Sequence, residues 1–167
     1  MSAQAHPNFA LRPFLAEDAV VLSEIFRASV LELTGDDYSE AQQEAWIAAA
    51  EEGGALTKRL GSQLTLVATM EGSPIGFASL VGKDKIDLLY VHPAAAGHGV
   101  AAMLIDALEK LAGARGAEKL KVDASDTARG FFEKRGYVAQ QRNSISVGDE
   151  WLANTTLSIE LAKRGTS

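Results

Sequence analysis

The segment from Ile86 to Ile105 constrains the fold more than any other part of this 167-residue chain. It reads as an apolar strand, a turn that contains Gly97 and Gly99, and the start of a helix. Small residues at a helix start leave the first backbone N–H groups open, and the helix dipole favours negative charge there. The sequence therefore predicts an anion site on the backbone from Gly97 to Ala102, with a pyrophosphate as its natural guest.

Two nucleotide-binding folds can be tested against this turn. The lysine and hydroxyl pair of a P-loop does not follow Gly99, and no dinucleotide fingerprint with three glycines is present. An NTPase and a Rossmann dehydrogenase therefore do not fit. A small-residue turn also serves close packing of a helix on a sheet, so the spacing alone leaves that structural interpretation open.

Two motifs in the chain resemble the GNAT superfamily of N-acetyltransferases. The Leu-Tyr-Val-His-Pro of residues 89–93, followed by the Gly-His-Gly-Val-Ala of residues 97–101, is similar to the central motif of the family. Residues 120–137, which include a Phe-Phe pair, are similar to its strand-and-helix motif. The resemblance runs from about Leu11 to Ala162, and the combination of the Phe-Phe pair with the segment 38–46 looks most like the YafP-like branch of small bacterial enzymes.

This resemblance implies an α/β (α+β) fold with a mixed central sheet of about seven strands, splayed between strands 4 and 5 and flanked by helices. Length and composition fit one domain over residues 1–167, with a core over residues 9–162. Apolar periodicity and turn residues predict the individual elements. Strands are expected at 9–14, 64–70, 74–80, 86–91, 119–123, 137–143 and 151–161. Helices are expected to start at Glu17, to run from Ser39 to the Gly53-Gly54 pair, to follow as a short helix up to Leu60, to run from the glycine turn at residues 97–99 to Gly113, and to span 126–134. The continuous apolar run at 86–91 predicts burial on both faces.

The resemblance also implies acetyl-CoA as the cosubstrate, bound in the cleft between the splayed strands. The pantetheine arm would lie as an extra strand against residues 89–91, and the pyrophosphate would lie on the amides after Ala96. Family members usually carry Arg or Gln at that position, so Ala96 removes one anchor but keeps the amide cradle. The expected cofactor-binding residues are Leu89, Tyr90, Val91, Gly97, His98, Gly99, Val100, Ala101, Ala102, Ser125, Phe131 and Phe132.

Transfer to an amine needs a neutral nitrogen close to the thioester carbonyl and a donor for the oxyanion. The resemblance places that donor at the backbone N–H of Val91. Asp87 is the candidate base, acting through water, because period-two alternation puts it on the face of Leu89 and Val91. The structural alternative is a solvated carboxylate at the end of a strand.

Phe132 stands where the family motif most often has the tyrosine that protonates the CoA sulfur. The thiolate either leaves unassisted, which a thiol pKa near 8.5 tolerates, or another hydroxyl replaces the missing one. The candidates are Tyr38, Ser125 and Tyr90, and Tyr38 is favoured because its loop resembles the substrate-facing segment of the family. Their structural alternatives are a loop aromatic, a helix cap and strand packing, respectively.

Composition limits the partners. The chain has 16 basic and 22 acidic residues, a net charge of −6, and no basic run longer than a pair, which argues against nucleic acid as a partner. Such a surface suits a cationic or neutral substrate. Cysteine is absent, so acyl transfer cannot pass through a cysteinyl intermediate. His92 and His98 lack a third ligand at convincing spacing, and no metal is expected.

The N-terminal residues lack the charged start and apolar stretch of a signal peptide, and no apolar run approaches the roughly 20 residues of a membrane span. We therefore expect a cytoplasmic protein. Three functions remain open at this stage: an acyl-CoA-dependent N-acetyltransferase, a catalytically idle acyl-CoA-binding sensor, and a purely structural domain. The acceptor, a small-molecule or peptide amine, is expected to contact residues 34–61 and the terminal hairpin. A homodimer is also left open.

Overall fold

The computed structural model describes residues 8–161. Two predictions concern residues outside this range. The prediction that no signal peptide is present concerns mainly residues 1–7, and Ala162 is the last residue of the predicted core. The strands are β1 (Phe9–Pro13), β2 (Leu64–Met70), β3 (Ser73–Val81), β4 (Lys85–Val91), β5 (Lys119–Ser125), β6 (Val138–Val147) and β7 (Glu150–Glu160). The α-helices are α1 (Ala19–Leu33), α2 (Glu40–Glu51), α3 (Ala55–Ser62), α4 (Val100–Ala114) and α5 (Asp126–Lys134).

The seven strands form one mixed sheet in the order β1-β2-β3-β4-β5-β7-β6. Only β4 and β5 run parallel, because α4 carries the chain across between them. The hairpin between β2 and β3 turns at Glu71 and Gly72, whose φ angles of 51° and 86° are those of a type I′ turn. The predicted fold class is confirmed, although β6 continues four residues beyond its expected end.

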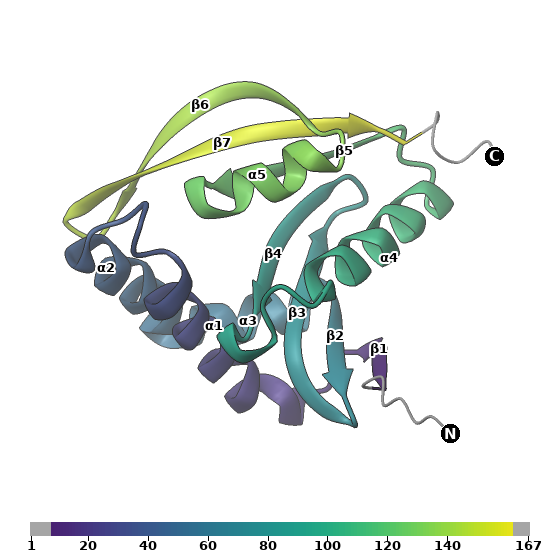
Figure 1. The fold of residues 1–167 in the computed structure, drawn as a ribbon, viewed down its shortest axis with the longest axis horizontal. Coiled ribbons are helices and arrows are strands. Elements are labelled where there is room, and N and C mark those ends of the chain that lie inside the picture. The colour runs from purple at the N-terminus through teal and green to yellow at the C-terminus, as the bar shows by residue number, and fades with distance from the viewer. Residues whose placement is uncertain (1–7, 162–167) are drawn as a thin grey trace.

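Helices cover the two faces of the sheet and enclose two separate cores (Figure 1). On one face, α4 buries Leu104, Ile105 and Leu108 against the sheet, and α5 adds Phe132 to the same core. On the other face, α1 buries Leu22 and Phe26 among side chains from α2, α3 and the strands β2, β3 and β4. Ser39 begins α2 as predicted, because its side chain accepts a hydrogen bond from the Gln42 amide in a capping box.

The sheet opens between β4 and β5. Only two residue pairs join these strands, Lys85 with Lys121 and Ile86 with Val122. Beyond them β5 turns away with β7 and β6, and Figure 1 shows the resulting separation from β4. The prediction that β4 is buried on both faces is therefore wrong for its second half: Ile86 and Leu88 are buried, whereas the strand from residue 89 onward is only partly covered.

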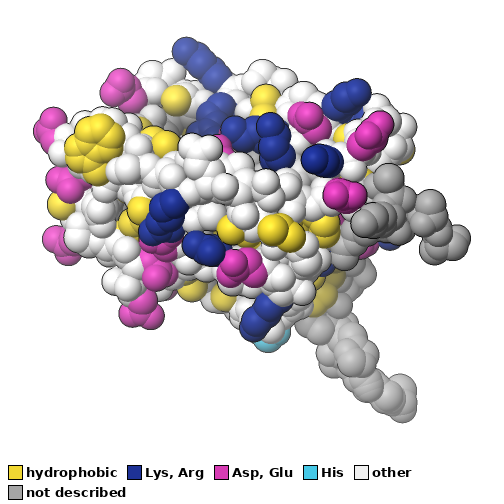
Figure 2. Space-filling model, turned by 90° about the horizontal axis from the view of Figure 1, so that it is seen from above, with side chains coloured by type: hydrophobic (Ala, Val, Ile, Leu, Met, Phe, Trp, Pro, Cys, Tyr) yellow, Lys and Arg dark blue, Asp and Glu magenta, His cyan; other side chains and the backbone are white. Residues whose placement is uncertain are grey.

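The last strand in the sheet, β6, is exposed along most of its length. Its pairing with β7 shifts between Ala139 and Gln141, so Gln140 is an extra residue in a β-bulge. Seen from above in Figure 2, Lys and Arg side chains gather over the middle of the molecular surface, while most Asp and Glu side chains lie towards its two ends. Among the described residues, no helix is long and apolar enough to cross a membrane.

One ion pair fixes the entry into α1. Arg12 of β1 donates two hydrogen bonds of 2.8 Å to the Asp18 carboxylate, and the Leu15 amide donates a third of 2.8 Å. The Asp18 side chain is only 6% exposed. The Arg12 hydrogen bonds lower the pKa of Asp18 more than burial raises it.

Because its folded-state pKa is lowered, Asp18 stabilises the fold above its ordinary pKa, and this contribution is lost as the pH falls through the folded-state value. We expect Asp18→Asn to lower the free energy of unfolding at pH 7 by about 1.5–3 kcal/mol, the usual contribution of hydrogen bonds to a charged group. The difference between wild type and variant should shrink as the pH falls below about 4, the ordinary pKa of an aspartate. Urea denaturation at several pH values measures both, and a difference independent of pH would contradict this account.

Candidate functional site

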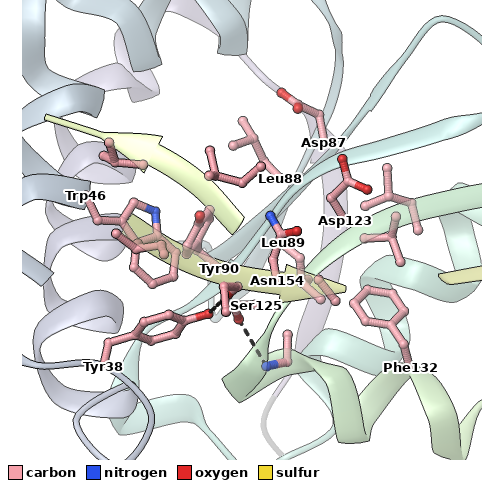
Figure 3. Close-up of a pocket in the computed structure, with 18 of the residues that line it drawn as sticks. Tyr38, Trp46, Asp87, Leu88, Leu89, Tyr90, Asp123, Ser125, Phe132 and Asn154 are labelled. Atoms are coloured by element: carbon pink, nitrogen blue, oxygen red, sulfur yellow. Dashed lines mark hydrogen bonds between the residues drawn. The ribbon is translucent and has the colours of Figure 1, made fainter. Parts of the chain in front are cut away.

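A cleft of about 320 Å³ lies where β4 and β5 part. Its walls come from α2, α3, β4, β5, α5 and the β6–β7 hairpin, so residues far apart in the sequence meet there. Figure 3 shows Leu89 and Tyr90 of β4 on one side, Ser125 and Phe132 on another, and Tyr38 at the edge. Of the predicted site residues, the cavity is lined by Tyr38, Asp87, Leu89, Tyr90, Ser125 and Phe132, whereas Val91, Phe131 and the turn from Gly97 to Ala102 are not among its lining residues.

The edge of β4 presents free backbone groups to this cleft. The His92 amide donates a hydrogen bond of 2.8 Å to the Ile75 carbonyl of β3. In an antiparallel ladder the next residue points its N–H and C=O groups the other way, so Val91 and Leu89 point theirs away from β3. On that side β5 has already diverged, which leaves this stretch of β4 able to pair with an extended guest.

The glycine turn lies between the end of β4 and α4. Gly97 and Gly99 have φ angles of 82° and 81°, a left-handed conformation that favours glycine, and Gly99 is the N-cap of α4. The first-turn amides of residues 100–102 have no partner within the helix. The Nδ1 atom of His92 accepts a hydrogen bond from the Ala94 amide, so this histidine caps the short helical turn after β4.

Asp87 does not lie on the face predicted for it. Leu80 pairs with Ile86 and Ser79 pairs with Leu88, so Asp87 is the extra residue of a β-bulge. The bulge breaks the period-two alternation on which the prediction rested, and Asp87 faces α3 instead of sharing the face of Leu89 and Val91. It still lines the cleft, and its side chain is 21% exposed.

Arg59 of α3 and Gln63, the residue that directly follows α3, hold one oxygen of this carboxylate. Arg59 donates from Nε and Nη2 to Asp87 Oδ2 at 3.0 and 2.8 Å, and Gln63 donates from Nε2 to the same oxygen at 2.8 Å. Ser79, which is fully buried, donates to Gln63 Oε1 at 2.6 Å and so fixes the orientation of that amide. Within residues 8–161 we find no hydrogen bond to Asp87 Oδ1, and that oxygen can accept one from a guest or a water.

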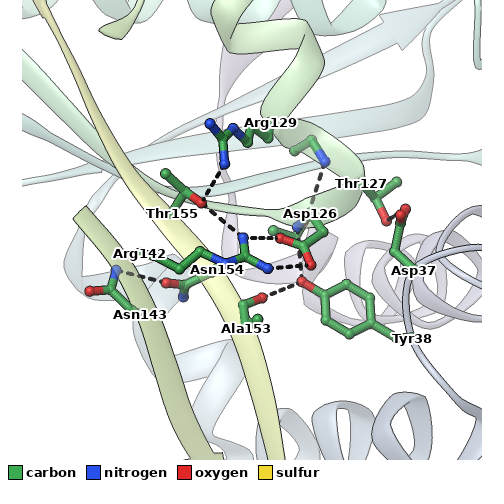
Figure 4. Close-up of polar contacts among 12 residues, drawn as sticks. Asp37, Tyr38, Asp126, Thr127, Arg129, Arg142, Asn143, Ala153, Asn154 and Thr155 are labelled. Carbon is green, nitrogen blue, oxygen red and sulfur yellow. Dashed lines mark hydrogen bonds and ion pairs between the residues drawn. The ribbon is translucent and has the colours of Figure 1, made fainter. Parts of the chain in front are cut away.

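Tyr38 joins three segments that are distant in the sequence (Figure 4). Its hydroxyl donates to the Ala153 carbonyl of β7 at 2.6 Å and accepts from the Asp126 amide of α5 at 2.9 Å. Burial raises the pKa of the phenol, and the Asp126 amide only partly offsets this. Arg142 donates two hydrogen bonds to the Asp126 carboxylate and tightens the same junction. These contacts give Tyr38 a structural role.

The other hydroxyl candidates are placed differently. Ser125 caps α5 by accepting from the Ala128 amide at 3.1 Å, as expected, and no acceptor for its own hydroxyl hydrogen is found in the described part of the chain. Tyr90 packs with its ring centroid 6.3 Å from that of Trp46, and burial raises its pKa to about 12. Ser125 and Tyr90 thus both line the cleft, and no acceptor for either hydroxyl hydrogen is found among residues 8–161.

The two phenylalanines separate in the structure. Phe132 is 1% exposed and lines the cleft, with its ring centroid 5.0 Å from that of Tyr137. Phe131 is absent from the lining and lies under the Arg135 guanidinium at 6.0 Å. Trp46, which we did not assign to the site, is half-buried and lines the cleft beside Tyr38.

Sequence reasoning missed three polar residues that line the cleft, namely Arg59, Asp123 and Asn154, together with Gln63, which binds Asp87. Arg59 lies in the last turn of α3 and Gln63 follows the helix as its extended C-cap, so helical spacing alone does not bring this pair together. Asp123 and Asn154 come from strands whose pairing a sequence does not show. Burial raises the pKa of Asp123, but hydrogen bonds from Thr156 and Lys85 outweigh it and lower the pKa below its ordinary value.

Across residues 8–161, no group of three or more His, Asp or Glu side chains is arranged to hold a metal ion. Neither His92, which caps a turn, nor His98, which lies exposed between the two glycines, has such neighbours.

Comparison with known proteins agrees with this geometry. Residues 34–153 match the family model of the acetyltransferase (GNAT) domain. The chain is 30% identical over 147 residues to the uncharacterized N-acetyltransferase YafP of Escherichia coli (strain K12), covering 88% of this chain and 93% of YafP. The chain therefore belongs to the GNAT acetyltransferase family, and it is YafP-like within that family.

Solved structures show the same fold. A GCN5-related N-acetyltransferase from Rhodopseudomonas palustris superposes with a TM-score of 0.89 at 59% identity, covering 96% of this chain and 99% of the other. The PaiA N-acetyltransferase from Thermoplasma acidophilum, solved in complex with coenzyme A, has a TM-score of 0.75 at 19% identity, covering 92% and 99%. The second likeness concerns the fold alone.

The contacts of Tyr38 allow a test that separates structure from catalysis. We expect Tyr38→Phe to lower the free energy of unfolding by about 1–3 kcal/mol, because the Ala153 carbonyl and the Asp126 amide both lose a buried partner. The kcat for any accepted amine should stay near the wild-type value. Denaturant titration and steady-state kinetics measure the two effects. A loss of about 10²-fold in kcat with unchanged stability would instead identify Tyr38 as the acid.

Proposed function

We propose that this protein is an acetyl-CoA-dependent N-acetyltransferase that moves the acetyl group directly to a primary amine within a ternary complex. The observation that carries the proposal is the free edge of β4, which leads from the cleft to the glycine turn of α4. An acyl-CoA has the matching shape, since its extended pantetheine arm joins the reacting thioester to a pyrophosphate. Membership of the acetyltransferase family supports this assignment.

In the proposed complex, the pantetheine amides pair with the backbone of Leu89 and Val91, while Tyr90 turns its groups towards β3. The pyrophosphate lies on the amides from Gly97 to Ala102, where the dipole of α4 favours its charge. Ala96 contributes no side chain to this contact. The coenzyme A bound to the PaiA relative is a precedent for such a ligand on this fold.

The reaction itself needs few groups. The neutral amine attacks the thioester carbon, the new C–N bond forms, and the C–S bond breaks with its electron pair staying on sulfur. We assign the oxyanion to the Val91 N–H, which points away from β3, and the amine proton to Asp87 Oδ1 through water. The Ser125 hydroxyl is the candidate donor to the departing sulfur, in place of the hydroxyl that Phe132 lacks.

A second candidate function is an acyl-CoA sensor without turnover. The buried ring of Phe132 at the usual position of the acid, together with Ala96 at the usual position of a phosphate anchor, is the observation in its favour. Consumption of acetyl-CoA across a panel of amines decides between the two functions, because a sensor binds acetyl-CoA and acetylates none of them.

The glycine turn provides a test of cofactor binding. We expect Gly99→Val to abolish the thermal stabilisation given by CoA, because a branched side chain disfavours φ near 81° and alters the amide cradle. Gly116→Val at the other end of α4, where φ is 90°, is the matched control. It carries similar strain and should keep the CoA-induced shift. A full shift in the Gly99 variant would refute the site.

Direct transfer predicts the kinetic order. Since the sequence holds no cysteine and the cleft places no other nucleophile beside a base, both substrates must be bound before the acetyl group moves. Double-reciprocal plots against acetyl-CoA at several amine concentrations should intersect. Parallel lines, or an acetylated enzyme detected by mass spectrometry after incubation with acetyl-CoA alone, would show a covalent intermediate and overturn this prediction.

A further inference from the structure

Asn154 of β7 is the strand partner of Ser125 of β5, and both residues line the cleft shown in Figure 3. Its Oδ1 atom accepts a hydrogen bond of 2.9 Å from Asn143 Nδ2 of β6. No acceptor for Asn154 Nδ2 is present among residues 8–161. The side chain therefore presents an unused amide NH₂ group at a lining position of the cleft.

A directional chain of hydrogen bonds sets the orientation of this amide. Asn143 Nδ2 also donates to Thr156 Oγ1 at 2.9 Å, and the Thr156 hydroxyl donates to Asp123 Oδ1 at 2.5 Å. Lys85 binds the other oxygen of Asp123 at 3.1 Å. Because a carboxylate can only accept, the chain runs in one direction, and a flipped Asn154 would bring two NH₂ groups together. The NH₂ group of Asn154 is thus fixed in place by its neighbours.

The charges around Asn154 disfavour an anionic guest. Among the described residues that line the cleft, the charged side chains are Arg59, Asp87 and Asp123. The charge of Arg59 is matched by Asp87, to which it donates two hydrogen bonds. Asp123 is likewise paired with Lys85, so a carboxylate or phosphate near Asn154 would meet no unpaired cation among the described lining residues to balance its charge.

The remaining wall beside Asn154 is apolar. Leu152, Ile145 and Val147 of the β6–β7 hairpin and Trp46 of α2 line it. Ile145 is 43% exposed, so this part of the cleft is open to a side group of the guest.

Building on the proposed function, we infer that Asn154 selects the acceptor by donating a hydrogen bond from Nδ2 to a neutral carbonyl oxygen next to the reacting amine. The acceptor class is then a primary amine that carries an amide or ester carbonyl and an apolar group, and no negative charge. An α-amino amide has this pattern. A free α-amino acid does not, because its carboxylate replaces the neutral carbonyl.

Three related acceptors separate these features: leucinamide, leucine, and 3-methylbutylamine, which lacks the carbonyl. We expect Asn154→Leu to lower kcat/KM for leucinamide about tenfold or more, the effect of one lost hydrogen bond in a desolvated site, with 3-methylbutylamine nearly unchanged. The acceptors differ in amine basicity, but this difference is the same for both enzymes. It therefore cancels when the ratio of kcat/KM for leucinamide to kcat/KM for 3-methylbutylamine in the variant is divided by the same ratio in wild type. For wild type, leucine should be a poorer acceptor than leucinamide.

Asn8→Leu, the same substitution at an exposed position at the start of β1, is the matched control and should leave all three acceptors unaffected. Each variant is first checked for a cooperative melt and for stabilisation by acetyl-CoA. If Asn154→Leu does not fold, Thr156→Val provides the second variant. This variant removes the hydroxyl that links Asn143 to Asp123, and so loosens the orientation of Asn154. It should reduce the preference for leucinamide over 3-methylbutylamine in the same direction as Asn154→Leu and to a smaller extent.

Equal losses for leucinamide and 3-methylbutylamine, no loss for either, or use of leucine as readily as leucinamide would overturn the inference. If wild type is stabilised by acetyl-CoA and acetylates only amines of another class, the assignment of Asn154 fails while the proposed function stands. If acetyl-CoA gives neither stabilisation nor transfer, both fail.

Discussion

The separation of β4 from β5 after two residue pairs is the constraint on which the site depends. A buried strand normally satisfies its backbone groups on both sides, and an unsatisfied buried peptide group is costly. Here the second half of β4 pairs on one side only, and the cleft keeps its other edge available to a guest. The two cores on opposite faces of the sheet make this arrangement stable, because each packs without closing the gap.

Two irregularities of the backbone lie at the two ends of the free edge of β4. The bulge at Asp87 turns a carboxylate towards α3, and the left-handed glycines at the other end lead into the first turn of α4, whose amides have no partner within the helix. Both irregularities lie within residues 86–105, the segment of the sequence that constrains the fold most. Local irregularity is found here where a ligand is expected, as in many functional sites.

How far the sequence predicts this molecule depends on the range of the interaction. Helix and strand positions follow from local periodicity and caps, and Ser39, Gly99 and Ser125 all cap helices where their residue types indicate. The face of Asp87 was mispredicted because a bulge shifts side-chain alternation by one residue and leaves no trace in the apolar pattern. The roles of Tyr38 and Asn154 depend on partners about 115 and 11 residues away, respectively, across strands whose register only tertiary packing determines.

The bulge in β6 has a consequence for the outer edge of the sheet. An edge strand offers a row of unpaired backbone groups on which another chain can extend the sheet, a common route to aggregation. The extra residue at Gln140 interrupts that row near the start of β6, and the exposed Arg142 follows two residues later. A foreign strand would have to break register at Gln140 and cover the charge of Arg142 to pair along the whole edge. The protein thereby keeps an opening between β4 and β5 inside its sheet and makes the outer edge at β6 a poor template for further strands.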